Sequence, residues 1–232
     1  MNVFEESKAA SKPWQIFAAA TMMGPQLAPN IDKMADYAPA AIAPYVKAYT
    51  DAVLADPAGY LFRAAVAMDL TKTPYNPDGF DGFSHERAAL INGFMEKANN
   101  PIILGGDLHD SWAWTLYEGG QMDGKPAAVN LGCPGVTSPG WALPLSGTFG
   151  ERLLFFICWM LYFTDLCRSL PFPFNSTIAS LADAVGGFDT IYKLIADTFV
   201  GGNNGMVYAN VDKKGFVAIK ATKVRCECRK KE

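Results

Sequence analysis

The stretch NPIILGGDLHDSW, residues 100–112, decides how the rest of the sequence is interpreted. Its apolar run from Ile102 to Leu104 predicts a buried strand that ends at two glycines. Asp107 and His109 follow where the chain leaves the sheet. A carboxylate oxygen and an imidazole nitrogen two residues apart at a strand end suit Fe, Zn or Mn. The spacing therefore makes Asp107 and His109 candidate metal ligands.

A second interpretation of these residues needs no metal. An Asp at a strand end can cap the following turn, and His109 can be satisfied by a backbone carbonyl. The D-x-H pattern by itself is weak, so both interpretations stay open on these residues alone.

Length and composition indicate a compact soluble protein. Half of the 232 residues are hydrophobic and 19 % are charged, which is sufficient for a core. The net charge of −3 gives no electrostatic argument for nucleic acid as a partner. A short basic cluster of Arg225, Arg229, Lys230 and Lys231 is expected to be a solvated tail. The first residues, MNVFEE, are acidic and polar, so no signal peptide is expected, and the location of the protein stays open.

One apolar segment, residues 153–163, raises the question of whether the chain crosses a membrane. It lies between Arg152 and Asp165 and is much shorter than the roughly 20 apolar residues that span a bilayer. We expect a buried helix or an interfacial segment rather than a membrane span. Its apolar surface could seek a partner.

The pattern of apolar residues predicts an α/β protein in which helices cover a mixed sheet. Ser84 is expected to cap one helix, and the turn DKKG at 212–215 is expected to join the last two strands as a hairpin. We expect one or two helices within 31–55, broken by Pro39 and Pro44. Further helices are expected at 4–11, 58–69, 84–99, 150–168 and 177–199, and strands at 14–22, 101–105, 112–117, 126–131, 206–211 and 215–221.

Five segments, taken in order, resemble the PhoD-like metallophosphatases, which are alkaline phosphatase and phosphodiesterase relatives within the calcineurin-like superfamily. Phe80 and Phe83 stand where that family has Trp and Tyr. The segments are KPWQI and MMG within 12–24, DGFDGF and ERAAL within 78–90, GGDLHDSWA at 105–113, VTSPG at 136–140, and MVY through KGF at 206–216.

The resemblance implies a fold, an activity and a ligand set. The fold is part of a four-layer αββα sandwich, and the activity is metal-dependent hydrolysis of phosphate mono- or diesters. Asp107 and His109 are two of the ligands that it implies, with iron and calcium as the ions. The resemblance also implies that residues 1–232 are the C-terminal portion of such a domain, with a helical insertion at about 145–200.

Two alternatives to an active enzyme follow from the same resemblance, because the family carries its other metal ligands in an N-terminal half. The chain could be a non-catalytic remnant that retains two ligands. It could also be one subunit of a split phosphatase that needs a separate N-terminal half, and an exposed sheet edge is then expected where that half pairs. A small-molecule binding module without metal is a weaker third interpretation.

Five further residues have a functional and a structural interpretation. Arg87 could clamp a phosphate or pair with a carboxylate. Trp112 and Trp114 are expected to lie on opposite faces of a strand, one in the core and the other against the pocket, with Trp112 as a candidate for substrate contact. Asp81, like Asp78, is expected to form a turn rather than approach the site.

Overall fold

The chain folds around one five-stranded mixed sheet, which confirms the predicted α/β class. The expected helices at 58–69 and 150–168, the apolar segment 153–163 and most of the expected insertion lie outside the described residues. Within the part that is described, no helix is long and apolar enough to cross a membrane. The computed structural model describes residues 2–27, 31–55, 74, 77–137, 187–223 and 226–231.

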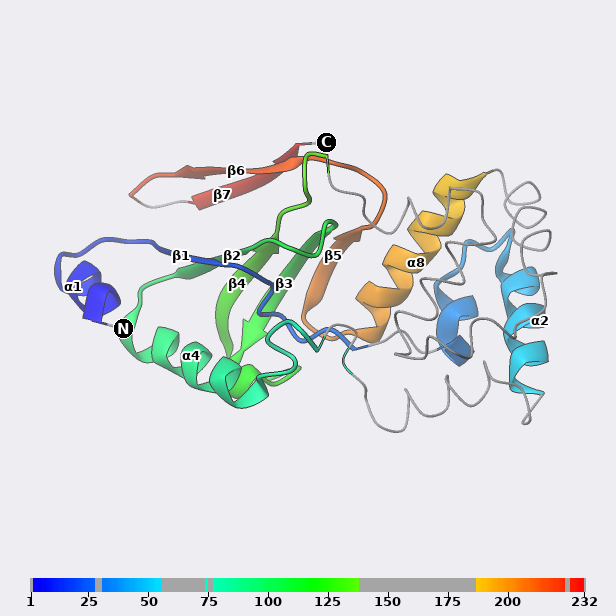
Figure 1. Ribbon diagram of the computed structural model, residues 1–232, viewed down its shortest axis with the longest axis horizontal. Coiled ribbons are helices and arrows are strands. Elements are labelled where there is room, and N and C mark those ends of the chain that lie inside the picture. The colour runs from blue at the N-terminus through cyan, green and yellow to red at the C-terminus, as the bar shows by residue number, and fades with distance from the viewer. Residues whose placement is uncertain are drawn as a thin grey trace.

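The sheet has the strand order β1-β2-β4-β3-β5 (Figure 1). Strands β1, β2 and β4 are parallel to one another, and β3 runs antiparallel to both β4 and β5. Strand β2 lies between two parallel neighbours, which explains why its sequence is an apolar run rather than an alternating pattern. The bounds are β1 Gln15–Ala19, β2 Pro101–Gly105, β3 Ser111–Tyr117, β4 Pro126–Gly132 and β5 Met206–Asn210.

Helices α4 (Ser84–Lys97) and α8 (Phe188–Gly202) cover one face of the sheet, and the main core lies beneath them. The Phe17 ring of β1 contacts Phe94 of α4 at a centroid distance of 5.4 Å. The Trp112 ring of β3 contacts Phe199 of α8 edge-on at 5.3 Å. Such edge-on contacts suit the charge distribution of aromatic rings. The bounds of α4 match the prediction within a few residues. Helix α8 confirms the second part of the helix expected at 177–199, and residues 177–186 lie outside the described residues.

One local prediction about a helix end needs correction. Ser84 does not cap α4, because it is the first helical residue and the capping position, Phe83, makes no side-chain cap. The one or two helices expected within 31–55 are two elements, the 3-10 helix η1 (Ile31–Tyr37) and α2 (Ala43–Leu54). They pack with α8 around a second, smaller core of Ile42, Val46 and Leu194. The first helix, α1 (Asn2–Ala9), packs against α4.

The C-terminal strands pair differently from the prediction. Strand β5 joins the main sheet through β3, while β6 (Phe216–Ala221) pairs with β7 (Cys226–Lys231) in a separate two-stranded sheet. The predicted hairpin across 212–215 is therefore wrong. Residues 229–231 of the basic cluster belong to β7 rather than to an irregular tail, and Arg225 lies outside the described residues.

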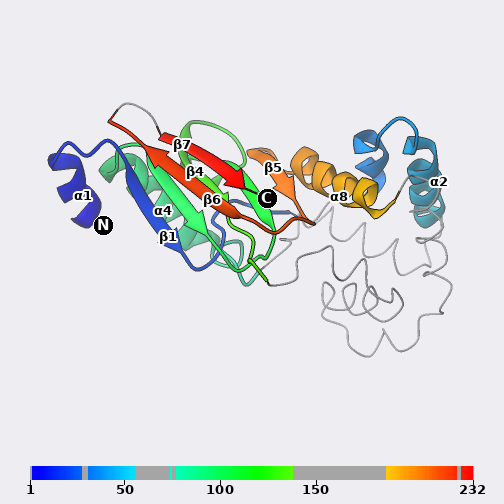
Figure 2. The same ribbon diagram turned by 90° about the horizontal axis from the view of Figure 1, so that it is seen from above.

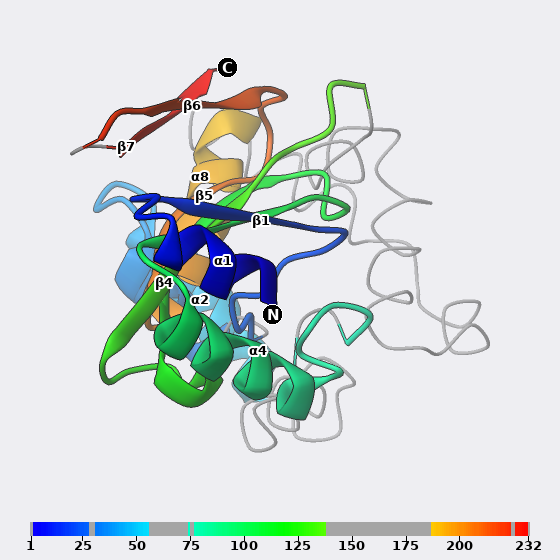
Figure 3. The same cartoon turned by 90° about the vertical axis from the view of Figure 1, so that its left-hand side faces the viewer.

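The β6–β7 hairpin forms a third layer. It lies on the opposite side of the main sheet from α4, and it projects over β1 and β4 when seen from above (Figures 2 and 3). The order helix, sheet and second β layer corresponds to three layers of the expected sandwich. The indole N–H of Trp14 donates to the Thr222 carbonyl at 2.7 Å and ties this layer to the start of β1.

Adjacent glycines at the end of α8 give a matched test of this packing. A Cβ on Gly201 would lie 2.0 Å from the Tyr37 ring of η1, whereas a Cβ on Gly202 would meet no atom within 4 Å. We expect Gly201→Ala to lower the free energy of unfolding by about 1–3 kcal/mol through overpacking. Gly202→Ala should raise it by up to about 1 kcal/mol through helix propensity. Urea unfolding measures both, and equal effects would contradict the contact between α8 and η1.

Candidate metal centre

The candidate site lies at the carboxyl edge of the parallel strands. The chain leaves β1, β2 and β4 at this edge, since the three strands are parallel. Strand β3 starts and β5 ends there as well, because Ser111 and Asn210 pair in the register. In α/β sheets, ligands bind beyond the carboxyl ends of the strands. The segments that meet at this edge are 20–27, 106–110, 133–137 and 211–215.

The turn between β2 and β3 presents both predicted ligands to the outside. Asp107 and His109 are exposed, with φ angles of 69° and 58°. Left-handed backbone is uncommon for residues other than Gly, although Asp and His adopt it more readily than most. The amide of Leu108 donates to the Gly106 carbonyl at 2.9 Å, so the backbone around Asp107 closes a three-residue turn. Two strained residues within one turn are a feature of functional sites.

The donor set of this turn fits a metal ion. Asp107 offers carboxylate oxygens and His109 an imidazole nitrogen, and the turn places both residues at the surface of one edge. Within the described ranges, however, no group of three or more His, Cys, Asp or Glu residues gathers. The turn therefore offers two candidate ligands, and a tight site needs more.

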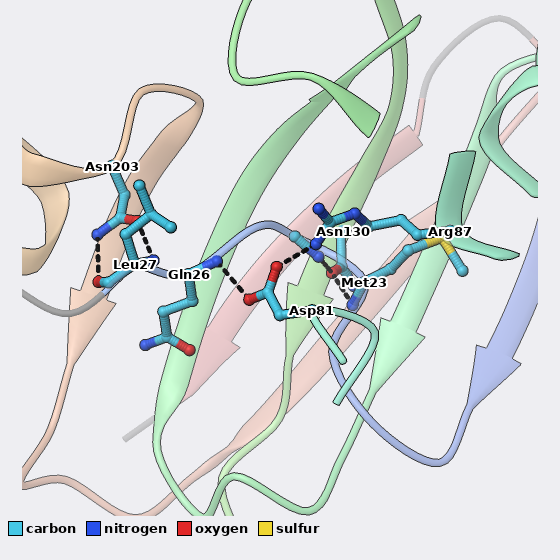
Figure 4. Close-up of polar contacts among 8 residues, drawn as sticks. Met23, Gln26, Leu27, Asp81, Arg87, Asn130 and Asn203 are labelled. Atoms are coloured by element: carbon cyan, nitrogen blue, oxygen red, sulfur yellow. Dashed lines mark hydrogen bonds and ion pairs between the residues drawn. The ribbon is translucent and has the colours of Figure 1, made fainter. Parts of the chain in front are cut away.

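After β1, the chain crosses this edge as a buried irregular segment, and the side chain of Asn130 holds its backbone. Asn130 of β4 is fully buried, and its Oδ1 accepts the amides of Met23 and Gly24, each at 2.8 Å (Figure 4). Its Nδ2 donates to the Ile103 carbonyl at 3.3 Å. A Cβ on Gly24 would lie 2.4 Å from the Trp114 ring, so only glycine permits this approach.

Two further side chains hold the same segment (Figure 4). The Oδ2 atom of Asp81 accepts the Gln26 amide at 2.8 Å, and its Oδ1 atom pairs with the Arg87 guanidinium. Asn203, at the end of α8, accepts the Leu27 amide at 2.6 Å. The polar backbone of 23–27 is thus satisfied from β4, from the loop before α4 and from α8.

Burial dominates the electrostatics of the Asp81–Arg87 pair. Both side chains are about one-tenth exposed. Desolvation raises the pKa of Asp81 above its ordinary value of 3.8, against the opposing attraction of Arg87 and the hydrogen bond from Gln26. The pair anchors the loop before α4 to the segment after β1.

The two weaker site predictions, Arg87 and Trp112, fall on buried residues. Arg87 pairs with a carboxylate, which is the structural interpretation of that residue, and Asp81 is its partner. Trp112 and Trp114 lie on the same face of β3, 2 % and 0 % exposed, with ring centroids 6.0 Å apart. The prediction of opposite faces is wrong, because side chains two residues apart on a strand share a face. Trp112 therefore packs in the core.

Sequence reasoning missed the two asparagines that hold the segment after β1. Asn130 carried one signal, since Asn is depleted in strands and this one interrupts an apolar pattern. Asn203 carried none, because an Asn after two glycines at a helix end is expected as a simple cap.

We expect Asn130→Leu to lower the free energy of unfolding by about 2–5 kcal/mol, because two buried amides lose their acceptor. Hydrogen exchange at the Met23 and Gly24 amides should accelerate relative to the rest of the core. As a control, Asn92 is exposed and accepts the Gly119 amide, so Asn92→Leu should cost less than about 1 kcal/mol. Similar losses in the two variants would contradict the role of Asn130.

The Asp81 pKa predicts a pH dependence with a definite sign. Because the pKa of Asp81 is raised in the folded state, the folded state binds the proton more tightly than the unfolded state does. The contribution of Asp81 to the free energy of unfolding therefore falls as pH rises from about 3.8 through the raised value. Asp81→Asn should be less stable overall, since Arg87 loses its partner. The stability gap between the wild type and Asp81→Asn should shrink as pH rises through that window. Urea unfolding at a series of pH values measures the gap, and a gap that widens would contradict the assignment.

Comparison with known proteins gives the family. The solved structure of PhoD is similar to this chain with a TM-score of 0.46 and 16 % identity, covering 95 % of this chain and 26 % of that chain. The chain thus spans about a quarter of the length of that structure. No curated protein matches the chain. The family model described as PhoD-like phosphatase matches residues 2–151, which is more than half of the chain. The chain belongs to the PhoD-like phosphatases.

Proposed function

We propose that this chain takes part in metal-dependent hydrolysis of phosphate mono- or diesters, with Asp107 and His109 as two of the metal ligands. The observation that carries the proposal is the exposed turn at 106–110, where both residues have left-handed backbone at the carboxyl edge of the sheet. Membership of the PhoD-like phosphatases supports the reaction class.

The residues of this turn have separable roles in the proposed reaction. The Asp107 carboxylate and the His109 imidazole would hold the ion. An ion of this class supplies positive charge that polarises a phosphoryl oxygen and makes water a better nucleophile. No side chain of the protein then has to act as nucleophile. Iron and calcium are the ions that the family resemblance suggests.

A second candidate function is that of one subunit in a split phosphatase, or of a non-catalytic remnant. It is favoured by the ligand count, because the described residues bring together fewer than three candidate metal-binding side chains. The remaining ligands would then come from a separate N-terminal half, as the family resemblance implies.

Hydrolysis of p-nitrophenyl phosphate and its bis ester, with Fe, Ca, Mn or Zn added, tests the proposal. We expect turnover that His109→Ala abolishes, a larger loss than the roughly 10–100-fold typical of residues that only support a ligand. His85→Ala is the matched control, because His85 is the other histidine of the chain and is exposed at the start of α4.

The outcomes separate the two candidates. Turnover that survives His109→Ala would contradict the proposed site. Absence of turnover with every metal, together with metal binding that depends on Asp107 and His109, would favour the split or remnant interpretation. Absence of both turnover and metal binding would refute the metal centre.

A further inference from the structure

The side of the molecule that carries β1 presents two open strand edges. In the described part of the chain, β1 pairs only with β2, and β6 pairs only with β7. Figure 2 shows β6 as the hairpin strand nearer to β1, and the bond from the Trp14 indole to the Thr222 carbonyl joins the start of β1 to the end of β6. An edge strand presents a row of backbone N–H and C=O groups that can pair with another chain.

These two edges lack the protection that other edges of this fold have. Charged residues, above all Lys, keep edge strands from pairing with other chains. Strand β1, with the sequence QIFAA, has no charged residue, and β6, with FVAIKA, has one. The edge strand β7, with CECRKK, has four. At the far edge of the main sheet, the register of β5 against β3 is interrupted between Ala113 and Trp114, and such irregularities also disfavour pairing.

The helix layer is also incompletely packed on this side. The Phe4 ring of α1 lies 6.3 Å from the Phe17 ring of β1, so α1 lies beside this edge strand. No residue of α1 is buried, and Val3 is 74 % exposed. On β1 itself, Ile16 is 47 % exposed. The helix layer, the main sheet and the hairpin therefore each present apolar surface or an open edge on the same side of the molecule.

Two exposed charges of opposite sign lie on this side. Glu6 is on α1 and Lys12 directly precedes β1, and neither side chain has an ion-pair partner among the described residues. The Lys12 amide donates to the Ser7 carbonyl at 3.0 Å, which keeps the two residues near each other. In a two-fold interface a residue i contacts j and j contacts i. Glu6 of one copy can thus pair with Lys12 of the other, twice over, which makes the surface complementary to itself in charge.

We propose that a second copy of this chain docks on this side, with β1 pairing antiparallel with the β1 strand of the other copy. A two-fold axis between identical strands makes them antiparallel, and QIFAA then faces itself with no like charges opposed. The two main sheets become one continuous sheet, and the docked copy covers the exposed parts of Val3 and Ile16. The inference goes beyond the proposed function and does not depend on the metal centre.

Sedimentation equilibrium of the full chain over a wide range of concentrations tests the proposal. We expect a dimer, and we expect Ile16→Lys to weaken dimerisation about tenfold or more, because it places a charge on each side of the strand pair. The matched control is Val207→Lys, the same type of change at a 65 % exposed position of β5, the other edge strand of the main sheet. It should weaken dimerisation less than about twofold.

Charge reversal tests the two-fold arrangement. Glu6→Lys and Lys12→Glu should each weaken dimerisation about three- to tenfold, because each turns two attractions into repulsions. The combined variant Glu6→Lys/Lys12→Glu restores opposite charges across the axis. It should dimerise within about twofold of the wild type.

Amide hydrogen exchange of the wild type gives a readout that needs no variant. The amides of β1 that do not pair with β2 should exchange more slowly as the protein concentration rises. Exchange that is independent of concentration, or a monomer at every concentration, would overturn the inference and leave this edge to a different polypeptide. Equal weakening by Ile16→Lys and Val207→Lys, or single charge variants that the combined variant does not rescue, would overturn it as well.

Discussion

The backbone of residues 23–27 passes buried across the carboxyl edge of the sheet, and its amides must be satisfied there. Side chains from three distant elements do this: Asn130 from β4, Asp81 from the loop before α4, and Asn203 from the end of α8. Without them the segment would leave unpaired polar groups in the core, which is costly. The three contacts therefore set how the sheet, the loop before α4 and α8 fit together.

This constraint also shapes the candidate site. Since Asn130 lies on β4 beside β2, the same buried contact that holds the segment after β1 fixes the strands from which the turn at 106–110 emerges. The turn can then keep two residues in left-handed backbone, because a rigid sheet supports it on both sides. Asp107 and His109 remain at the surface, while the neighbouring Asp110 and Ser111 are buried.

Sequence reasoning found the parts of the fold that local pattern controls. The bounds of β2 were predicted correctly because a central parallel strand is a continuous apolar run. The pairing of β5 with β6 was predicted wrongly. The turn signal at 212–215 is local, whereas β5 pairs with β3, a strand almost a hundred residues earlier in the sequence. Asn130 and Asn203 could not be assigned, because their partners lie 107 and 176 residues away in the sequence. The turn carrying the candidate ligands Asp107 and His109 could be located, because the two residues and the strand end are contiguous in the sequence.

The central claim is that Asp107 and His109 bind a metal ion at this edge. The most direct measurement is paramagnetic broadening of backbone amide signals by Mn²⁺ in the isotope-labelled chain. We expect broadening centred on residues 106–110, reaching the neighbouring turn at 211–215, and lost in the His109→Ala variant. Broadening centred elsewhere, or unchanged in that variant, would contradict the account.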